Sequence, residues 1–355
     1  MTTDALPAAI DADHLSGVLR ASGALGADGA VRTLTVESSR ATVLSRIVRL
    51  RLAYDGAAGA APASLILKTG LPERGEAWRA RANQREVAFY TQVAAAMPAR
   101  LVPRCFEARF DRETNAWHLL LEDLTDTHMI ASSWPLPPTL AQTERIVALH
   151  ARFHAAWWDD PRLGVSIGTW LETGDAPLQA FAAKVEAFAE RLGDRLAPER
   201  RDLYVRLIDQ GHRLNARHHA HRNLTIVQGD AHVWNVFLPR AEDSDDARLF
   251  DWDSWRVDVA TDDLAYMMAL HWYPEHRHRA ERLMLDRYHA GLLAHGVTGY
   301  DRRALDDDYR LSVLWQAATP VWQAAGDIPP WIWWPHLERI FQAIDDLGCR
   351  DLLAG

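Results

Sequence analysis

The sequence predicts an α+β protein in two unequal parts: an N-terminal five-stranded antiparallel sheet with a helix, and a larger, mainly helical part. Two observations lead to this prediction. Short apolar segments typical of strands fill the first third of the chain, whereas helical periodicity dominates after Asp123. A chain of 355 residues is also long enough for two lobes and a large core. We therefore expect an N-terminal part at 1–122 and a C-terminal part at 123–355.

The N-terminal part is expected to begin with a short helix and to continue as strands separated by turns. Asp55-Gly56 opens a Gly- and Ala-rich turn between two of these strands. A later segment places apolar residues such as Val87 and Tyr90 on one side of a helix. In chain order we expect helix 10–22, strands 31–37, 45–54 and 63–68, helix 76–97, and strands 104–110 and 117–122.

The C-terminal part is expected to be helical apart from one hairpin. A helix from Thr139 to Trp158 follows a proline-rich stretch, and helical segments continue to about His221. The hairpin occupies 225–253, with the acidic run 242–246 as its solvated turn. Helices resume from Asp262 to the end of the chain.

Composition excludes several classes of function. The net charge of −9 argues against a protein that binds nucleic acid by neutralising phosphates. Cys105 and Cys349 form no metal or redox spacing, which favours a reducing compartment. We see no signal peptide and no apolar run of the roughly 20 residues needed to span a bilayer. We therefore expect a cytoplasmic monomer or homodimer without a nucleic-acid or membrane partner.

One polar motif contains the residues that we expect to take part in catalysis. Asp230 and Asn235 lie five positions apart in a loop that opens into an apolar strand, and Asp251 follows the next strand. Phosphoryl transfer from a metal nucleotide uses one carboxylate to orient the attacking hydroxyl. It uses an amide and a second carboxylate to hold magnesium. The motif therefore predicts the reaction and the nucleotide together.

Lysine is scarce, because only Lys68 and Lys184 occur among 39 basic residues. A chain that uses Arg wherever a surface cation is enough retains Lys where a compact ammonium is needed. Lys68 ends a short apolar strand, which suits a contact with a nucleotide phosphate. Lys184 reads as a helix surface residue. Survival of both lysines by chance is the alternative.

These motifs resemble those of the aminoglycoside phosphotransferase and choline kinase family, and within it the ecdysteroid-kinase-like branch. The resemblance extends from about residue 30 to the C-terminus and implies a bilobal, protein-kinase-like fold. It also implies ATP and Mg²⁺ as cofactors. The matching segments are Gly229-Asp230 with Asn235, Phe250 to Asp253, Leu120 to Leu124, Ala148 to Ala151, and Asp262 to Ala265.

The resemblance implies a role for each matching residue. Asp230 matches the catalytic base, and Asn235 and Asp251 match the magnesium ligands. Lys68 matches the Lys that contacts the nucleotide phosphates, and Glu86 matches the helix Glu that pairs with it.

Two further segments complete the nucleotide site that the resemblance implies. The hinge at 121–124, with Glu122, Asp123 and Leu124, would read the adenine edge through its backbone. The segment Glu37 to Ser45 takes the place of the phosphate loop, with Ser38 and Ser39 as contacts. It departs from the family because it contains no Gly. A second departure is Gln228, where the family usually has His. Asp263 is expected to brace the catalytic loop.

Other readings of the same residues stay open at this stage. His150 and His154 have a spacing able to hold zinc on a helix, although the Glu usual beside the first His is missing. Asp230 and Asp251 would also suit a hydrolase pair, but that reading leaves Asn235 and Lys68 unexplained. A nucleotide-binding pseudokinase without turnover is the non-enzymatic alternative.

Tryptophans suggest where the acceptor binds. Trp331, Trp333 and Trp334 crowd a segment with three prolines, which we expect to be a loop, and Trp315 and Trp322 share a helix face. We take Trp315, Trp331 and Trp334 as acceptor contacts, with a Trp-rich core as the alternative. An aromatic wall suits an apolar polycyclic alcohol or a cationic amino alcohol. An antibiotic acceptor also stays open. The sequence thus predicts a small-molecule kinase that phosphorylates a hydroxyl group.

Overall fold

The computed structural model describes residues 6–7, 10–42, 45–56, 58–71, 84–97, 100–241 and 243–354. The chain divides into two compact units. The first unit contains Met1–Met129 and Phe237–Ser254, and the second contains Ile130–Val236 and Trp255–Gly355. Residues 237–254, which the sequence analysis assigned to the C-terminal part, thus pack with the N-terminal residues. Among the described helices, none has the length and apolar character to cross a membrane.

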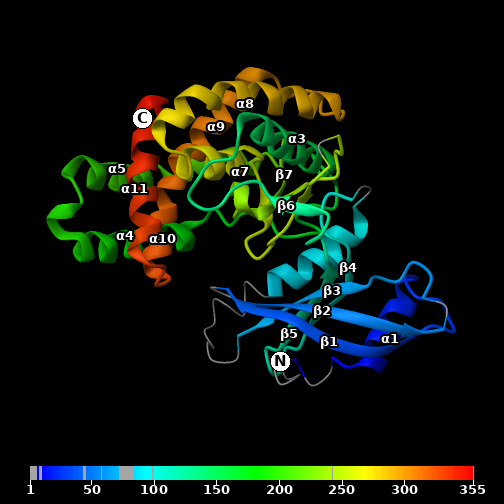
Figure 1. The fold of residues 1–355 in the computed structure, drawn as a ribbon. Helices are drawn as coiled ribbons and strands as arrows, with labels where there is room; N and C mark the ends of the chain where they lie inside the picture. The colour runs from blue at the N-terminus through cyan, green and yellow to red at the C-terminus, as the bar shows by residue number, and fades with distance from the viewer. Residues whose placement is uncertain are drawn as a thin grey trace. The chain divides into compact units, whose positions relative to one another are not determined.

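The first unit is built on a five-stranded antiparallel sheet, as predicted (Figure 1). The spatial order β1-β2-β3-β5-β4 makes β3 the central strand. Its register sets Lys68 opposite Ile47 on one side and Leu119 on the other. The strands are β1 (Ala30–Ala41), β2 (Ser45–Asp55), β3 (Ser64–Gly70), β4 (Cys105–Phe110) and β5 (Trp117–Glu122).

Helix α1 (Ala12–Ala21) lies against this sheet. Its N-cap Asp11 accepts a hydrogen bond from the His14 backbone N–H, which satisfies one of the free donors of the first turn. Leu15 and Leu19, one helical turn apart, are fully buried in the core between helix and sheet. This core fixes α1 on the sheet.

Two segments near the expected nucleotide site differ from the sequence prediction or fall partly outside the described structure. Strand β1 continues to Ala41, so Ser38 and Ser39 lie in a strand paired with Arg49 and Val48, not in a loop. Of the expected helix 76–97, residues 76–83 lie outside the described part. Residues 84–88 are helical and continue as a π-helix, Phe89–Val93, and a 3₁₀ turn.

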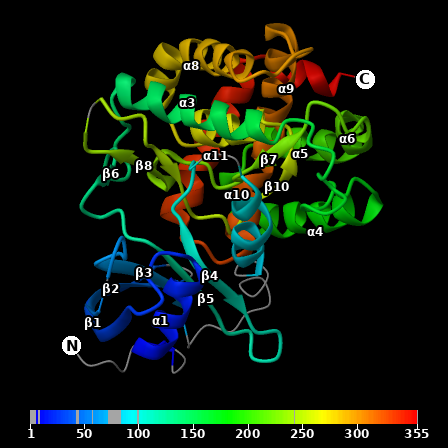
Figure 2. The ribbon, with the colours of Figure 1, turned by 90° about the vertical axis from the view of Figure 1, so that its right-hand side faces the viewer.

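The second unit is mainly helical, again as predicted. Helices α3 and α8 lie side by side (Figure 2), and Gly291 of α8 allows the close approach because an added Cβ would lie 2.7 Å from Ala151 Cβ. The helices are α3 (Leu140–Ala156), α4 (Asp175–Leu192), α5 (Pro198–Asp209), α6 (Gly211–His219), α7 (Thr261–Ala265), α8 (Pro274–Ala294), α9 (Arg302–Trp315), α10 (Thr319–Ala325) and α11 (Pro330–Asp346).

Short strands hold the segments that carry the motif. Strands β7 (Thr225–Val227) and β10 (Arg256–Asp258) pair antiparallel, and β7 leads directly into the loop of Asp230. A second small sheet has the order β6-β8-β9, formed by β6 (His128–Ile130), β8 (Val236–Pro239) and β9 (Arg248–Leu249).

The prediction of a loop containing Trp331, Trp333 and Trp334 is wrong. Helix α11 begins at Pro330, so Trp331, Trp333 and Trp334 lie in its first turns. Pro330 is compatible with the first helical position, where its fixed φ suits the helix and its missing N–H would have no partner in any case. Pro329 and Pro330 therefore precede and begin this helix, and Pro335 lies inside it.

Candidate active site

Lys68 is the centre of a buried charge cluster in the first unit. Its ammonium donates to Glu86 Oε1 at 2.7 Å and to Asp251 Oδ1 at 2.7 Å. The three residues come from β3, from the helical segment 84–88 and from the segment after β9. Glu86 and Asp251 are 18 and 183 positions from Lys68 in the sequence, and the fold brings both to one ammonium.

The charges of this cluster support one another. Burial alone would lower the Lys68 pKa, but the Asp251 and Glu86 carboxylates outweigh that effect and raise it. Lys68 therefore stays protonated. Burial also raises the pKa of Glu86, and the Lys68 ammonium opposes that rise. The Glu86 side chain is 3% exposed and the Asp251 side chain is 36% exposed, so Asp251 is the partner that solvent reaches.

Aromatic stacking holds the Asp251 segment in place. Trp252 is fully buried and stacks on Phe89 at 3.8 Å between ring centroids and 5° between planes. Phe250 stacks on Phe237 of β8 at 4.1 Å. Asp251 lies between these anchors in the left-handed region, with φ of 67°. An L-residue adopts that conformation at a cost, so the packing of both neighbours maintains it.

The Asp230 carboxylate is held at both oxygens in the second unit. Tyr266, at the start of a π-helix (Tyr266–Leu270), donates its hydroxyl to Oδ1 at 2.5 Å. Asn235 Nδ2 donates to Oδ2 at 3.0 Å and to the Asp230 backbone carbonyl at 2.9 Å. Gly229, with φ of 81°, makes the turn from β7. The carboxylate therefore has a fixed orientation.

Asp263 of α7 holds the backbone of this loop. Its Oδ2 accepts from the Gln228 backbone N–H at 2.8 Å, and its Oδ1 accepts from the Gly229 N–H at 2.9 Å. Burial would raise the Asp263 pKa, but the hydrogen bond from His154 and the nearby charges lower it. Asp263 therefore stays ionised and makes the contacts expected of a brace.

His150 and His154 face Asp263 from α3. His154 Nε2 lies 3.1 Å from Asp263 Oδ2, and its Nδ1 bonds the Tyr288 hydroxyl at 2.7 Å. His150 is fully buried, and burial lowers its pKa to about 4. The two histidines whose spacing suggested zinc thus lie beside Asp263, which holds the loop of Asp230.

The residues expected at the hinge differ in what their side chains contact. Asp123 accepts from Arg49 Nε at 2.6 Å and from the Thr125 hydroxyl at 2.6 Å. Burial would raise the Asp123 pKa, but hydrogen bonds with Ser64, Thr125 and Arg49 lower it to about 2. Glu122 accepts from the Arg104 backbone N–H at 3.1 Å, and Leu124 is buried. The Glu122 and Asp123 side chains are thus paired with neighbouring polar groups.

An aromatic cluster extends from Asp230 in the second unit. His232 Nε2 lies 3.6 Å from Asp230 Oδ2, and the His232 ring is 5.4 Å from His271, which is 4.5 Å from His336. Trp234 lies 5.5 Å from His232 and 6.3 Å from Trp134. The members of the aromatic cluster are Trp134, His232, Trp234, Tyr266, His271, Trp331 and His336.

The three tryptophans expected at the acceptor do not lie together. Trp331 joins the aromatic cluster, 5.4 Å from Trp134, and is 61% exposed. Trp334 lies beside the buried Trp333, at 6.1 Å between rings. Trp315 instead lines a pocket of about 280 Å³ together with Trp322.

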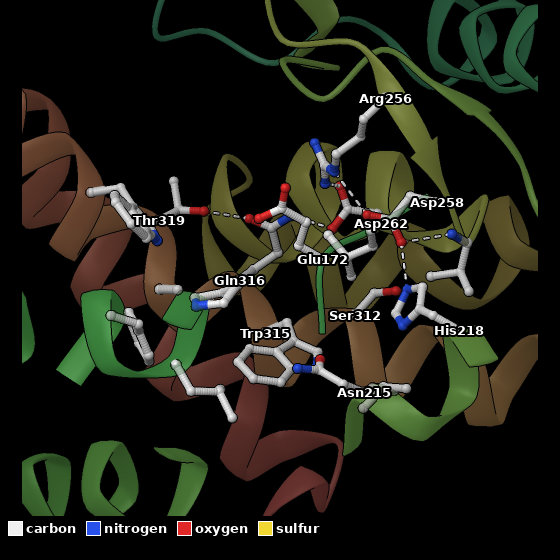
Figure 3. A pocket seen from close by; sticks show the side chains of 18 residues that line it. Glu172, Asn215, His218, Arg256, Asp258, Asp262, Ser312, Trp315, Gln316 and Thr319 are labelled. Carbon is white, nitrogen blue, oxygen red and sulfur yellow. Dashed lines mark hydrogen bonds and ion pairs between the residues drawn. The ribbon is translucent and has the colours of Figure 1, made fainter. Parts of the chain in front are cut away.

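Figure 3 shows this pocket, which α4, α6, α9 and α10 help to enclose. Arg256 bonds the carboxylates of Asp258 and Asp262 at its upper side, and His218 bonds Asp258 at 2.8 Å. Trp315 lies across the opposite side. The polar groups of the wall are largely paired with one another.

Sequence reasoning missed most of the aromatic cluster. His232 and Trp234 were within the motif but received no role, and Tyr266, His271 and Trp134 lie well outside it. Their common feature is ring contact within one cluster, which reaches Asp230 through Tyr266 and His232 and which no sequence spacing reveals.

Comparison with known proteins gives one family match and many structural ones. The model of the ecdysteroid kinase-like family matches residues 171–296. No curated protein matches the chain in sequence. The family match confirms the predicted resemblance.

Three solved structures illustrate the fold. An unproven aminoglycoside phosphotransferase from Ralstonia eutropha JMP134 superposes with a TM-score of 0.59 at 13% identity, covering 96% of this chain and 98% of that one. Choline kinase from Cryptosporidium parvum Iowa II superposes with a TM-score of 0.56 at 10% identity, covering 96% of this chain and 98% of that one. The aminoglycoside phosphotransferase APH(2")-IIia, in complex with GDP and kanamycin, superposes with a TM-score of 0.54 at 11% identity, covering 94% of this chain and 99% of that one. The chain therefore has a protein-kinase-like fold.

Proposed function

We propose that the protein is a kinase that transfers the γ-phosphate of magnesium-bound ATP to a hydroxyl group of a small molecule. The observation that carries the proposal is the Lys68 ammonium between the Glu86 and Asp251 carboxylates. A buried Lys–Glu pair beside a further carboxylate is the arrangement that kinases use to contact phosphates and metal. Lys184 is the only other Lys in the sequence, so the Lys retained at position 68 supports a specific role for its ammonium.

The proposed metal ligands suit magnesium. Asp251 is the solvent-accessible carboxylate of the Lys68 cluster, at 36% exposure. Both described hydrogen bonds of the Asn235 side chain use Nδ2, which leaves its amide oxygen for a cation. Carboxylate and amide oxygens are the ligands that magnesium prefers. When bound, the metal would offset the charge of the phosphate oxygens.

The remaining roles follow from the contacts of the second unit. Asp230 would accept the proton of the acceptor hydroxyl as its oxygen attacks the γ-phosphorus, and the nucleoside diphosphate would leave. Tyr266 and Asn235 would hold the Asp230 carboxylate in the orientation that this transfer needs. Asp263 would keep the loop in place through the Gln228 and Gly229 amides.

The aromatic cluster is the place we propose for the acceptor. Burial, together with the neighbouring His rings and Arg339, lowers the His271 pKa well below its ordinary value. Burial likewise lowers the His336 pKa to about 3. These rings are therefore uncharged at neutral pH. A wall of neutral aromatic rings suits an alcohol with an apolar body, or one cationic head over a Trp face, better than a polycation.

Turnover of a panel of alcohols, read by ADP release, tests the proposal. The panel contains apolar polycyclic alcohols, amino alcohols and aminoglycosides, each with ATP or GTP and with or without magnesium. Magnesium-dependent ADP release with at least one acceptor is the expected result. A melting-temperature shift with ATP but no turnover on any acceptor would favour a pseudokinase. No nucleotide effect of either kind would contradict the proposal.

A further inference from the structure

Two histidines and a glutamate from three elements of the first unit meet away from the Lys68 cluster. His14 of α1 and His118 of β5 each place Nε2 at 2.7 Å from the same atom, Oε2 of Glu107 on β4. The ring centroids of the two histidines are 6.3 Å apart. We call these three residues the His–Glu–His cluster. Its members are separated by up to 104 positions, since Glu107 is 93 from His14 and 11 from His118.

The fold fixes each member independently. The Asp11 cap holds the His14 backbone at the start of α1. In the sheet, Arg109 of β4 lies opposite His118 of β5, so Glu107, two residues before Arg109, projects from the same face as His118. The side chains therefore converge without any loop that must first become ordered.

The donor atoms form a set that zinc prefers. Two imidazole nitrogens and one carboxylate oxygen are a common set of three protein ligands, with a fourth position left for water. Imidazole favours zinc over magnesium, which takes oxygen ligands. The cluster thus differs in chemistry from the magnesium ligands proposed above.

The three donor atoms lie within 4.8 Å of one another, so a small adjustment of the side chains would bring them around one ion. Zinc bonds of about 2.0–2.2 Å at tetrahedral angles place neighbouring donor atoms about 3.3 Å apart. The Nε2–Oε2 separations are now 2.7 Å, as hydrogen bonds. The side chains of His14 and Glu107 are 21% and 17% exposed, so an ion has access from solvent.

We propose that His14, Glu107 and His118 bind one zinc ion, which links α1 to β4 and β5. The site would stabilise the first unit because binding to the folded state alone shifts unfolding to higher temperature. The proposal stands apart from the proposed kinase activity, because no member of the cluster takes part in it.

Zinc titration of chelator-treated protein, in excess magnesium, tests the site by calorimetry and melting temperature. We expect one zinc per chain and a rise of a few degrees in melting temperature at zinc concentrations far above Kd. Cobalt(II) should give the visible absorption of a four-coordinate ion. His14→Gln keeps a hydrogen-bond donor for Glu107 but loses an imidazole ligand, so it should abolish both signals.

A matched control and a second variant make the test decisive. His212 also pairs with a carboxylate, Asp175 at 2.9 Å, but in the second unit, so His212→Gln should bind zinc as the wild type does. His118→Gln provides an independent loss of ligand, with folding checked by circular dichroism without zinc. No zinc binding by the wild type, or stoichiometric binding that survives in His14→Gln and His118→Gln, would overturn the proposal. Loss of the zinc in His150→Gln instead would assign it to α3.

Discussion

Tyr266 donates its hydroxyl to Asp230 Oδ1 at 2.5 Å, although the two residues are 36 positions apart. Asp230 is otherwise held by Asn235 at Oδ2. The phenol thus fixes the rotation of the carboxylate from the side opposite the amide. A catalytic base works only when its oxygen faces the proton it removes, so we regard Tyr266 as a positioning residue.

Tyr266→Phe should therefore lower turnover and leave nucleotide affinity unchanged. A hydrogen bond to a charged group contributes about 1.5–3 kcal/mol, which corresponds to a loss of roughly 10- to 150-fold in kcat. Steady-state kinetics with ATP and acceptor varied separately would measure it. An unchanged kcat in the folded variant would show that the contact has no part in turnover.

Asp230→Asn tests the proposed base. The amide can occupy the same space but cannot accept the acceptor proton, so turnover should fall by roughly 10²-fold or more while nucleotide binding persists. Nucleotide binding is followed by melting temperature, and turnover by ADP release. Wild-type turnover would remove Asp230 from the mechanism.

Lys68→Arg and Lys184→Arg form a matched pair of substitutions. The Lys68 ammonium meets two carboxylates in a buried site, where a broad planar guanidinium cannot take its place. Lys184 lies over the Trp322 ring at 5.0 Å, a contact that Arg also makes well. We expect a strong loss of turnover in the first variant and no measurable change in the second. Equal behaviour would make Lys68 an ordinary strand-end cation.

The sequence predicted much of the fold because its patterns are local. Alternation along strands such as 45–54 predicted the five-stranded sheet, and the Thr139–Gln142 capping box begins α3 where a helix was expected. Local patterns failed at Trp331, where prolines suggested a loop but a helix begins at Pro330 and continues through Pro335. They also failed at Ser38, which continues β1 through pairing with β2.

The candidate site was predictable only in part, for the same reason. Lys68, Glu86 and Asp251 were each identifiable because short motifs surround them, and the structure brings them together. Tyr266 and His271 have no motif of their own, and only the folding of α7 and the π-helix brings them to Asp230 and His232. Contacts of this kind depend on tertiary packing.

Metal removal tests the oxygen ligands. Activity should disappear in EDTA and return with magnesium or manganese, because Asp251 and Asn235 offer hard oxygen donors. Asp251→Ala should weaken the magnesium-dependent part of ATP binding most, as measured by titration with and without the metal. Full activity after thorough chelation would contradict phosphoryl transfer from a metal nucleotide.

The tryptophans test where the acceptor binds, since the structure separates them. Trp331 belongs to the aromatic cluster around Asp230, whereas Trp315 lines the pocket beside Trp322. If the acceptor lies in the cluster, Trp331→Ala should raise the acceptor KM and leave the ATP KM nearly unchanged. Loss of an aromatic contact of about 1–2 kcal/mol corresponds to a rise of roughly 5- to 30-fold.

Trp315→Ala and Trp334→Ala serve as the comparison. A rise in acceptor KM for Trp315→Ala alone would move the acceptor to the pocket of Figure 3. Trp334 packs beside the buried Trp333, so its substitution should lower the melting temperature more than it changes KM. Trp331 is 61% exposed and contributes less to the core, so a change in its acceptor KM without loss of stability would mark a binding residue. Unchanged acceptor KM in all three variants would exclude both aromatic surfaces as the acceptor site.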